Sequence, residues 1–222
     1  MAKHLSPQLA AEFVLANTAP IAPPHVPELQ LYLADEAHDL WLKTEDELAE
    51  IGLPPPFWAF AWAGGQVLAR FILDHPEHVQ GRHVVDFASG SGIVAIAAAK
   101  AGARHVTACD VDPFCRAAID LNAALNNVEI AFEHHDMIGR KFTADCLLAG
   151  DVFYDREFAA RLVPWFNSLT RDGVDIWIGD PGRAYLPRER MQLCATSEVA
   201  VTRALEDAEV KRSSVWRYTS TV

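Results

Sequence analysis

The sequence predicts a single α/β domain in which a mainly parallel sheet carries helices on both faces. From residue 82 onward, apolar segments of strand length alternate with helical segments, and the links between them are short. Such alternation is typical of a parallel sheet covered by helices. The chain has 222 residues, 50% of them hydrophobic, which is enough for one core and requires no second domain.

The first 53 residues are expected to form a small N-terminal extension that covers the domain at 54–222. Ser6 can cap the first helix, and Leu9 and Phe13 are placed together on one face of it. The expected elements, in order, are a helix at 6–17, an extended proline-rich linker at 18–27, a strand at 29–33 and one or two helical turns at 46–51.

The domain opens with an aromatic run at 57–62 that leads into an apolar helix through Leu73. Trp58 and Phe60 are expected to pack in the core. The elements that follow are seven strands, at 83–87, 105–109, 129–134, 144–149, 174–179, 198–205 and 212–219, and helices at 92–101, 113–126, 156–169 and near 188–195. The last two strands are expected to form an antiparallel hairpin.

Composition and charge favour a cytoplasmic protein. The formal net charge of -11 disfavours a nucleic-acid partner. Residues 1–20 resemble neither a signal peptide nor a transit peptide, and no segment approaches about 18 uninterrupted apolar residues, so no membrane contact is expected. The cysteines show no paired spacing and are interpreted as reduced core thiols rather than metal ligands; they are Cys109, Cys115, Cys146 and Cys194.

A glycine-containing turn follows the strand at 83–87 and predicts a nucleotide-cofactor site. Gly90 and Gly92 remove side chains where the backbone must pass close to a ligand, and the next helix begins directly after them. Asp110, twenty residues after Gly90, ends the next strand, where a carboxylate can bind both ribose hydroxyls. The alternative is a tight turn between strand and helix that binds no ligand.

Asp86 decides which cofactor this turn suits. It lies four residues before Gly90, where its charge would repel the diphosphate of a dinucleotide and would suit a ligand with a cationic head. An NAD-dependent oxidoreductase is therefore the weaker alternative. The order of an apolar strand, Asp86 and the glycine turn resembles the first motif of the S-adenosylmethionine-dependent methyltransferases with a Rossmann-like sheet of seven strands.

This resemblance implies a set of cofactor-binding residues. Asp86 would shape the site near the methionine end, Asp110 would hold the ribose, and Trp62 would border the methionine part. After the third strand, Asp136 and Met137 would contact the adenine. The complete set that the resemblance implies is Trp62, Asp86, Ala88, Ser89, Gly90, Gly92, Asp110, Val111, Asp136, Met137 and Gly150. The neighbouring His134 and His135 lack a matching cluster of ligands, so no metal site is expected.

A second motif, at 150–155, follows the strand that should end beside the cofactor. Together with 178–183 and the later Val215 and Trp216, it resembles the branch of lysine methyltransferases that modifies the β subunit of electron transfer flavoprotein. The resemblance runs from about residue 56 to 218 and implies a protein substrate. It departs at the N-terminus, because animal members are mitochondrial and this chain shows no convincing presequence. The alternative for Asp151 is a helix cap, with Phe153 as a core aromatic.

The chemistry of an amine acceptor assigns roles to this second motif. A lysine amine with a pKa of about 10.4 must lose its proton before it can attack a sulfonium methyl group. Asp151 is expected to capture and orient the incoming ammonium, while Phe153 and Tyr154 exclude water and make cation–π contacts. The proton would then leave to water without a strong general base.

The sequence therefore predicts a protein-lysine methyltransferase that uses S-adenosylmethionine, with the electron transfer flavoprotein β subunit as its expected substrate. The alternatives are a ribosomal or other protein, a small molecule, or a cofactor-binding module that contacts a partner without catalysis.

Overall fold

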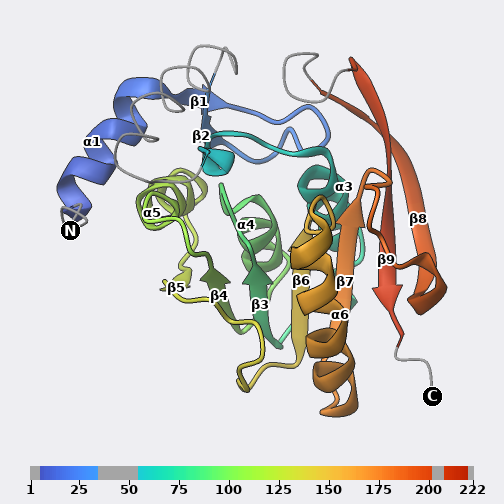
Figure 1. Cartoon of the computed structure of the whole chain (residues 1–222). Coiled ribbons are helices and arrows are strands. Elements are labelled where there is room, and N and C mark those ends of the chain that lie inside the picture. The colour runs from blue at the N-terminus through green and yellow to red at the C-terminus, as the bar shows by residue number, and fades with distance from the viewer. Residues whose placement is uncertain (1–5, 35–54, 202–207, 220–222) are drawn as a thin grey trace.

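The protein, described here by a computed structural model, is built around a seven-stranded sheet (Figure 1). The structure describes residues 6–34, 55–201 and 208–219. The strand order is β5-β4-β3-β6-β7-β9-β8; the first five strands are parallel, and β9 and β8 are antiparallel to their neighbours. The strands are β3 (His83–Phe87), β4 (His105–Cys109), β5 (Ala131–Glu133), β6 (Cys146–Gly150), β7 (Asp175–Asp180), β8 (Met191–Ala200) and β9 (Val210–Tyr218). The predicted fold class is confirmed.

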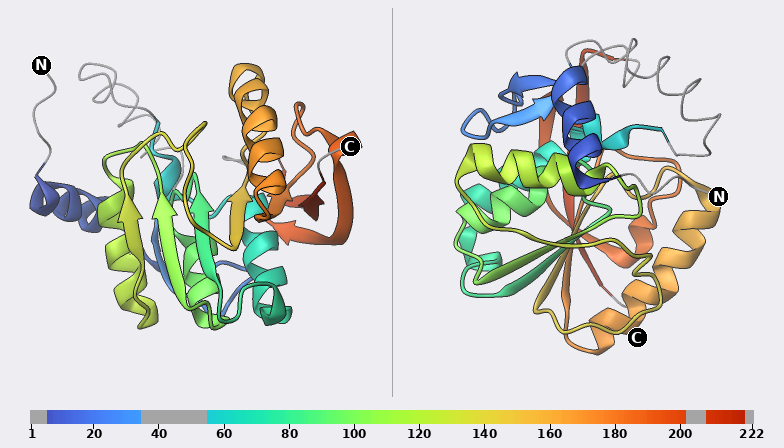
Figure 2. Two further views of the ribbon diagram at one scale, coloured as in Figure 1. Left: turned by 90° about the horizontal axis from the view of Figure 1, so that it is seen from below. Right: turned by 90° about the vertical axis from the view of Figure 1, so that its left-hand side faces the viewer.

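Helices cover both faces of the sheet (Figure 2). One face packs against α3 (Ala63–Asp74), α4 (Ile93–Lys100) and α5 (Cys115–Asn126), and the other packs against α6 (Arg156–Arg171). In α6, the buried residues Leu162, Trp165, Phe166 and Leu169 recur every three or four positions, which places them on one side of the helix. None of the helices in the described ranges combines the length and apolar character that crossing a membrane requires.

The N-terminal segment packs against α5 and begins with α1 (Pro7–Asn17). Ser6 caps α1 as predicted, because its side chain accepts a hydrogen bond from the Leu9 N–H at 3.2 Å. Of the two residues expected on one face of this helix, Phe13 packs against the core and Leu9 does not. Leu9 is 56% exposed, and the buried residues of α1 are Ala10 and Val14.

The expected linker contains a short strand that the sequence did not predict. This strand, β1 (Ala19–Ile21), pairs antiparallel with β2 (Leu31–Leu33), and the two form a separate small sheet. Two buried asparagines of α5 hold β2 in place: Asn122 accepts a hydrogen bond from the Tyr32 N–H at 2.6 Å, and Asn126 accepts one from the Gln30 N–H at 3.1 Å. The helical turns predicted at 46–51 and the domain boundary at 53/54 lie outside the described residues.

The C-terminal region corrects one predicted element. The helix expected near 188–195 is a single 3-10 turn at Arg188–Arg190, after which β8 begins at Met191. Residues 191–200 pair with β9 along their length, with an irregularity in register between Leu193 and Ala195. This pairing satisfies the backbone of β8 and overrides its weak helical periodicity. Cys194 is exposed on this strand, whereas the other three cysteines are buried as expected.

Candidate active site

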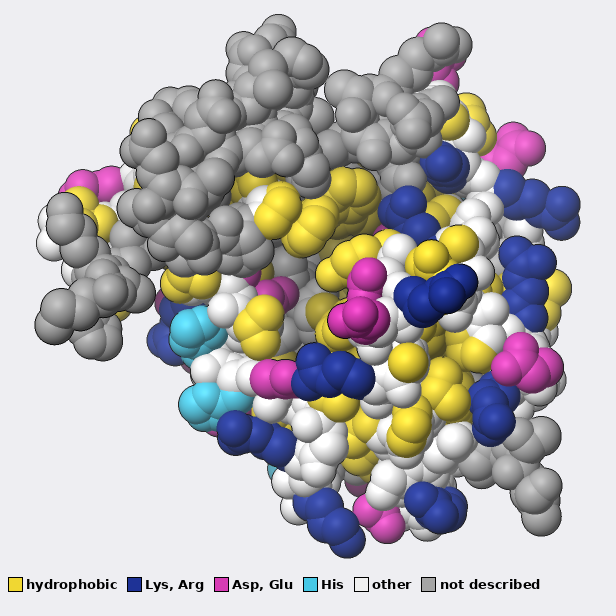
Figure 3. Space-filling model, viewed as in Figure 1, with side chains coloured by type: hydrophobic (Ala, Val, Ile, Leu, Met, Phe, Trp, Pro, Cys, Tyr) yellow, Lys and Arg dark blue, Asp and Glu magenta, His cyan; other side chains and the backbone are white. Residues whose placement is uncertain are grey.

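A cavity of about 390 Å³ lies where the carboxyl ends of β3, β4 and β6 approach the start of α3. Ten of the predicted site residues line it: Trp62, Asp86, Ala88, Ser89, Gly90, Asp110, Val111, Gly150, Asp151 and Tyr154. Four others do not line it: Gly92, Asp136, Met137 and Phe153. Figure 3 shows hydrophobic side chains gathered in the upper middle of this face, with acidic and basic side chains beside and below them.

The glycine turn is held together by Asp110. One carboxylate oxygen of Asp110 accepts a hydrogen bond from the Gly90 N–H at 2.9 Å, and the other accepts one from the Asp112 N–H at 3.0 Å. Gly90 has a φ of 53°, which favours glycine, and a side chain placed there would approach nothing closer than 3.7 Å. The backbone at Gly90 is therefore open to a ligand in the cavity.

Gly92 serves the packing of the turn rather than the cavity. Its φ of 80° is also left-handed, and an added Cβ would lie 3.0 Å from the side chain of Ile119 in α5. Glycine at this position lets the turn and α4 approach α5 closely. Gly92 does not line the cavity, so its expected contact with a cofactor stays a prediction.

Asp86 is buried beneath the turn and faces the cavity. One of its carboxylate oxygens accepts hydrogen bonds from the Ser89 hydroxyl and from the Ala95 N–H. Burial raises the pKa of Asp86 to about 7, against 3.8 for an exposed carboxyl. Burial likewise raises the pKa of Asp112, another residue of the cavity wall, to about 7. With Asp110, this side of the cavity carries three carboxyl groups, an arrangement that favours a cationic ligand.

Asp151 caps the helix α3, whose residue Gly64 lies 87 residues earlier in the chain. One oxygen of its carboxylate accepts hydrogen bonds from the N–H groups of Gly64, at 2.5 Å, and Gly65, at 3.2 Å, in the first turn of α3. The cap of the following helix, α6, is instead Asp155. The alternative of a helix cap therefore holds for Asp151, but the helix is α3. A φ of 55° at Asp151 turns its side chain toward α3.

The other oxygen of Asp151 is paired with Arg183, which belongs to the motif at 178–183 but was assigned no contact of its own from the sequence. The guanidinium donates to this oxygen from Nε at 3.0 Å and from Nη2 at 2.7 Å. It also lies 6.0 Å from the ring centre of Trp62, and it lines the cavity. Asp180 shapes the loop, because one of its oxygens accepts hydrogen bonds from the N–H groups of Gly182 and Arg183 at 2.6 and 2.7 Å.

Aromatic rings form the wall beside this ion pair. Phe57 lies 5.8 Å from Trp62 and 5.9 Å from Tyr154, measured between ring centres, and Tyr154 lies 6.0 Å from Phe158. Tyr154 is 53% exposed, so the wall reaches the surface at its ring. Trp58 and Phe60 are buried as predicted, and they also line the cavity.

Phe153 does not belong to this wall, which corrects its predicted role beside the acceptor. Its side chain is 0% exposed and packs in the core on the α6 side of the sheet, 6.3 Å from the ring of Phe166. The left-handed backbone two residues earlier, at Asp151, turns the chain so that Phe153 faces the core and Tyr154 faces the cavity. The alternative of a core aromatic is confirmed.

Asp136 and Met137 lie on the loop that follows β5, outside the cavity wall. Asp136 is paired with Arg161 of α6 at 2.5 Å and accepts a hydrogen bond from the Ile138 N–H at 3.0 Å. Met137 is buried in the core on the α6 side. In this structure Asp136 has a pairing role and Met137 a packing role, and neither lines the cavity, so their contact with the adenine stays a prediction.

Comparison with known proteins extends these observations. A family model described as "Ribosomal protein L11 methyltransferase (PrmA)" matches residues 68–150, the part that contains the glycine turn, Asp110 and β6. Among solved structures, the ribosomal protein L11 methylase of Lactobacillus delbrueckii subsp. bulgaricus has a TM-score of 0.53 at 22% identity over 72% of this chain and 81% of that chain. The magnesium protoporphyrin IX methyltransferase of Synechocystis PCC 6803 has a TM-score of 0.51 at 15% identity over 71% of this chain and 80% of that chain. These two structures share the fold.

Curated relatives match over most of the chain. The electron transfer flavoprotein beta subunit lysine methyltransferase of Xenopus laevis is 37% identical over 93% of this chain and 85% of its own length. The proteins of the same name from Danio rerio and Homo sapiens are 35% and 32% identical, over 93% and 86% of this chain and 82% and 75% of their own lengths. With this identity across most of both sequences, the chain belongs to the electron transfer flavoprotein beta subunit lysine methyltransferase family.

Proposed function

We propose that this protein transfers methyl groups from S-adenosylmethionine to lysine side chains of a protein, and that its acceptor is the β subunit of electron transfer flavoprotein. One observation carries the proposal. A single cavity joins a carboxylate-rich glycine turn, suited to a cationic cofactor, to an aromatic wall beside Asp151 and Arg183, suited to an amine. The names of the relatives support both the reaction and the acceptor.

The cofactor side of the cavity fits S-adenosylmethionine. Its volume of about 390 Å³ is in the range of small-molecule sites, roughly 300 to 1,000 Å³. Asp110 would bind the ribose, Asp86 would lie near the positively charged end, and Trp62 would border the methionine part. The backbone from Ala88 to Gly90 would approach the cofactor, and Val111 and Gly150 would complete the wall. When bound, the cofactor supplies an electrophilic methyl group, which an amine lone pair takes while the sulfur keeps the electrons of the broken C–S bond.

The acceptor side of the cavity meets the needs of a lysine amine. Phe57, Tyr154 and Phe158 exclude water, which lowers the pKa of a bound amine and so releases its proton. Their rings also favour a cationic head group while it is still charged. The match to ribosomal protein L11 methyltransferases covers 68–150, which is the cofactor half of the site. This match therefore supports S-adenosylmethionine as the cofactor. The acceptor is inferred from the relatives that match over most of the chain.

The proposed function is tested by incubating the purified protein with S-adenosylmethionine and electron transfer flavoprotein from the same cell, then locating new methyl groups by mass spectrometry. We expect methylated lysines on the β subunit. In a matched sample, Asp110→Ala is expected to weaken cofactor binding by about 1.5 to 3 kcal/mol, because hydrogen bonds to a charged group are lost. If no lysine of any protein in a cell extract gains a methyl group, the proposal is wrong.

The raised pKa of Asp86 predicts that cofactor binding depends on pH. With a pKa of about 7, Asp86 is mostly protonated at pH 6 and mostly ionised at pH 8. The affinity for S-adenosylmethionine, whose sulfonium is cationic, is expected to rise about tenfold over this range, and that for S-adenosylhomocysteine is expected to rise less. Isothermal titration at both pH values measures the difference.

Two variants identify the carboxyl group responsible. Asp86→Asn should remove most of the pH dependence of cofactor affinity. Asp112→Asn measures how much of that dependence comes from Asp112, whose pKa is also raised. The folded-state pKa of Asp86 lies above its ordinary value of 3.8. In the protein without ligand, the stability that Asp86 contributes is therefore fully present below about pH 4 and is lost as the pH rises through about 7. An unchanged slope of unfolding free energy against pH in Asp86→Asn would contradict this assignment.

A further inference from the structure

We propose that Arg183 is the positioning residue that lets the cavity accept an amine in its neutral form, because its guanidinium offsets the charge of Asp151. This inference rests on the proposed function, and it concerns the acceptor side alone. It addresses a physical conflict in that site. A carboxylate beside the acceptor would hold a lysine as ammonium, yet methyl transfer needs the neutral amine.

The geometry of Asp151 shows how this conflict is resolved. Both of its oxygens already accept hydrogen bonds from N–H groups, one from the start of α3 and the other from two nitrogens of Arg183. Such an arrangement stabilises the ionised carboxylate, and the negative charge is balanced by groups of the protein itself. An arriving amine therefore faces an ion pair with no net charge, rather than an isolated anion.

Arg183 is held where it can act in this way. Its backbone N–H is bound by the buried side chain of Asp180, which fixes the loop after β7. Its guanidinium lies over Trp62, and it forms part of the cavity wall. Because an arginine stays charged at every pH at which proteins fold, it offsets the charge of Asp151 over the whole pH range of the reaction. Without this offset, the carboxylate would favour the ammonium over the neutral amine.

Other charged and titratable groups also face this part of the cavity. Among the described residues, those on the wall are Asp86, Asp110, Asp112, Cys115 and Tyr154, whereas Asp180 and Arg188 lie behind Arg183 and do not line the cavity. None of them donates to Asp151 in the hydrogen bonds described above. A change at Arg183 alone therefore leaves these groups in place and isolates the effect of its charge.

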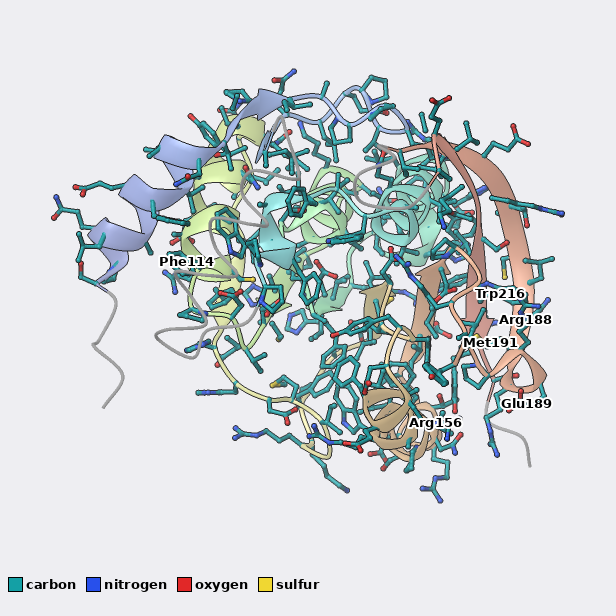
Figure 4. The ribbon with its side chains drawn as sticks, turned by 45° about the horizontal axis from the view of Figure 1, so that its top comes forward. Phe114, Arg156, Arg188, Glu189, Met191 and Trp216 are labelled. Carbon is teal, nitrogen blue, oxygen red and sulfur yellow. The ribbon has the colours of Figure 1, made fainter. Side chains whose placement is uncertain are left out.

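The test measures the single-turnover methylation rate against pH from 6.5 to 9.5, with saturating cofactor and electron transfer flavoprotein as the acceptor. In Arg183→Met, we expect the apparent pKa of the rate to rise by about one unit, so that the rate at pH 7.5 falls about tenfold and the deficit shrinks as the pH rises. Arg183→Lys should restore most of the rate at pH 7.5. The matched control is Arg188→Met. Arg188 is exposed, follows Arg183 in the connection between β7 and β8, and is not among the residues that line the cavity. Figure 4 shows it beside β8 and β9.

The double variant Asp151→Asn with Arg183→Met removes both charges and keeps the inference testable if the single variant is unstable. Its apparent pKa should return to that of the unchanged protein, even though its rate is lower. A second readout needs no turnover. The acceptor is titrated by calorimetry into the protein bound to S-adenosylhomocysteine, in two buffers of different ionisation heat. The difference gives the number of protons released on binding, which should be smaller in Arg183→Met than in the unchanged protein.

Two negative results have different meanings. If Arg183→Met lowers the rate by the same factor at every pH and releases as many protons as the unchanged protein, Arg183 is only structural and the inference is wrong. If the unchanged protein methylates no lysine at any pH, the proposed function itself fails, and the inference fails with it.

Discussion

Replacing Asp151 by alanine is expected to lower the free energy of unfolding by about 3 to 5 kcal/mol. The change removes the partner of the partly buried Arg183 guanidinium and leaves two N–H groups at the start of α3 without an acceptor. Breaking a buried pair by removing one member is costly because the other charge stays in a poorly solvated place. Methyl transfer should be lost as well, because α3 and the loop after β7 carry Trp62 and Arg183.

Urea unfolding followed by circular dichroism measures this loss, and Asp155→Ala is the matched control. Asp155 also caps a helix, α6, but it is exposed, and its cap accepts a single hydrogen bond from the Phe158 N–H. Removing it should cost about 1 kcal/mol. If the two variants lose the same stability, Asp151 is an ordinary cap and does not join separate parts of the site.

Gly64→Ala is expected to destabilise the protein strongly, whereas Gly65→Ala is expected to be nearly neutral. A Cβ at Gly64 would overlap the backbone oxygen of Gly179 in β7 and would lie 2.5 Å from the Asp151 carboxylate. A Cβ at Gly65 would meet only a methyl group of Ile93, at 3.2 Å, which a small side-chain shift relieves. Overpacking against rigid backbone costs about 1 to 3 kcal/mol or more.

The two glycines make a sharp comparison because both lie in the first turn of α3, where alanine gains up to about 1 kcal/mol of helix propensity. Thermal unfolding of the two variants side by side measures the difference. Equal melting temperatures would show that α3 can move away from β7 at little cost, and would remove the reason for glycine at position 64.

The central strands could be predicted from the sequence because their signals are local. The strands β3 and β4 were placed to the residue, since each is a short apolar run between turn-forming residues. The glycine turn and Asp110 were found for the same reason: their spacing along the chain is fixed by one strand, one helix and the next strand.

The acceptor side could be predicted only in part because its contacts are long-range. Asp151 and Arg183 are 32 residues apart, and Asp151 and Gly64 are 87 apart, so no local pattern pairs them. Phe153 was misplaced because its role was assigned from the chemistry of an amine acceptor, which cannot show that its side chain faces the core after the left-handed backbone at Asp151. The first half of strand β8 was misread as a helix, and the predicted strand began only at 198, because the pairing of β8 with β9, not its own periodicity, decides its conformation.

Asn122 links residues 6–34 to the turn that is expected to bind the cofactor. This fully buried side chain accepts from the Tyr32 N–H of β2 and donates to the Ser91 carbonyl of the glycine turn at 2.8 Å. If the N-terminal segment detached, the amide oxygen of Asn122 would lose its donor, and the side chain that steadies the turn would be free to rotate. Local opening of the N-terminal segment and loosening of the turn are thus thermodynamically coupled, and we expect a ligand that orders the turn to slow amide hydrogen exchange at Tyr32.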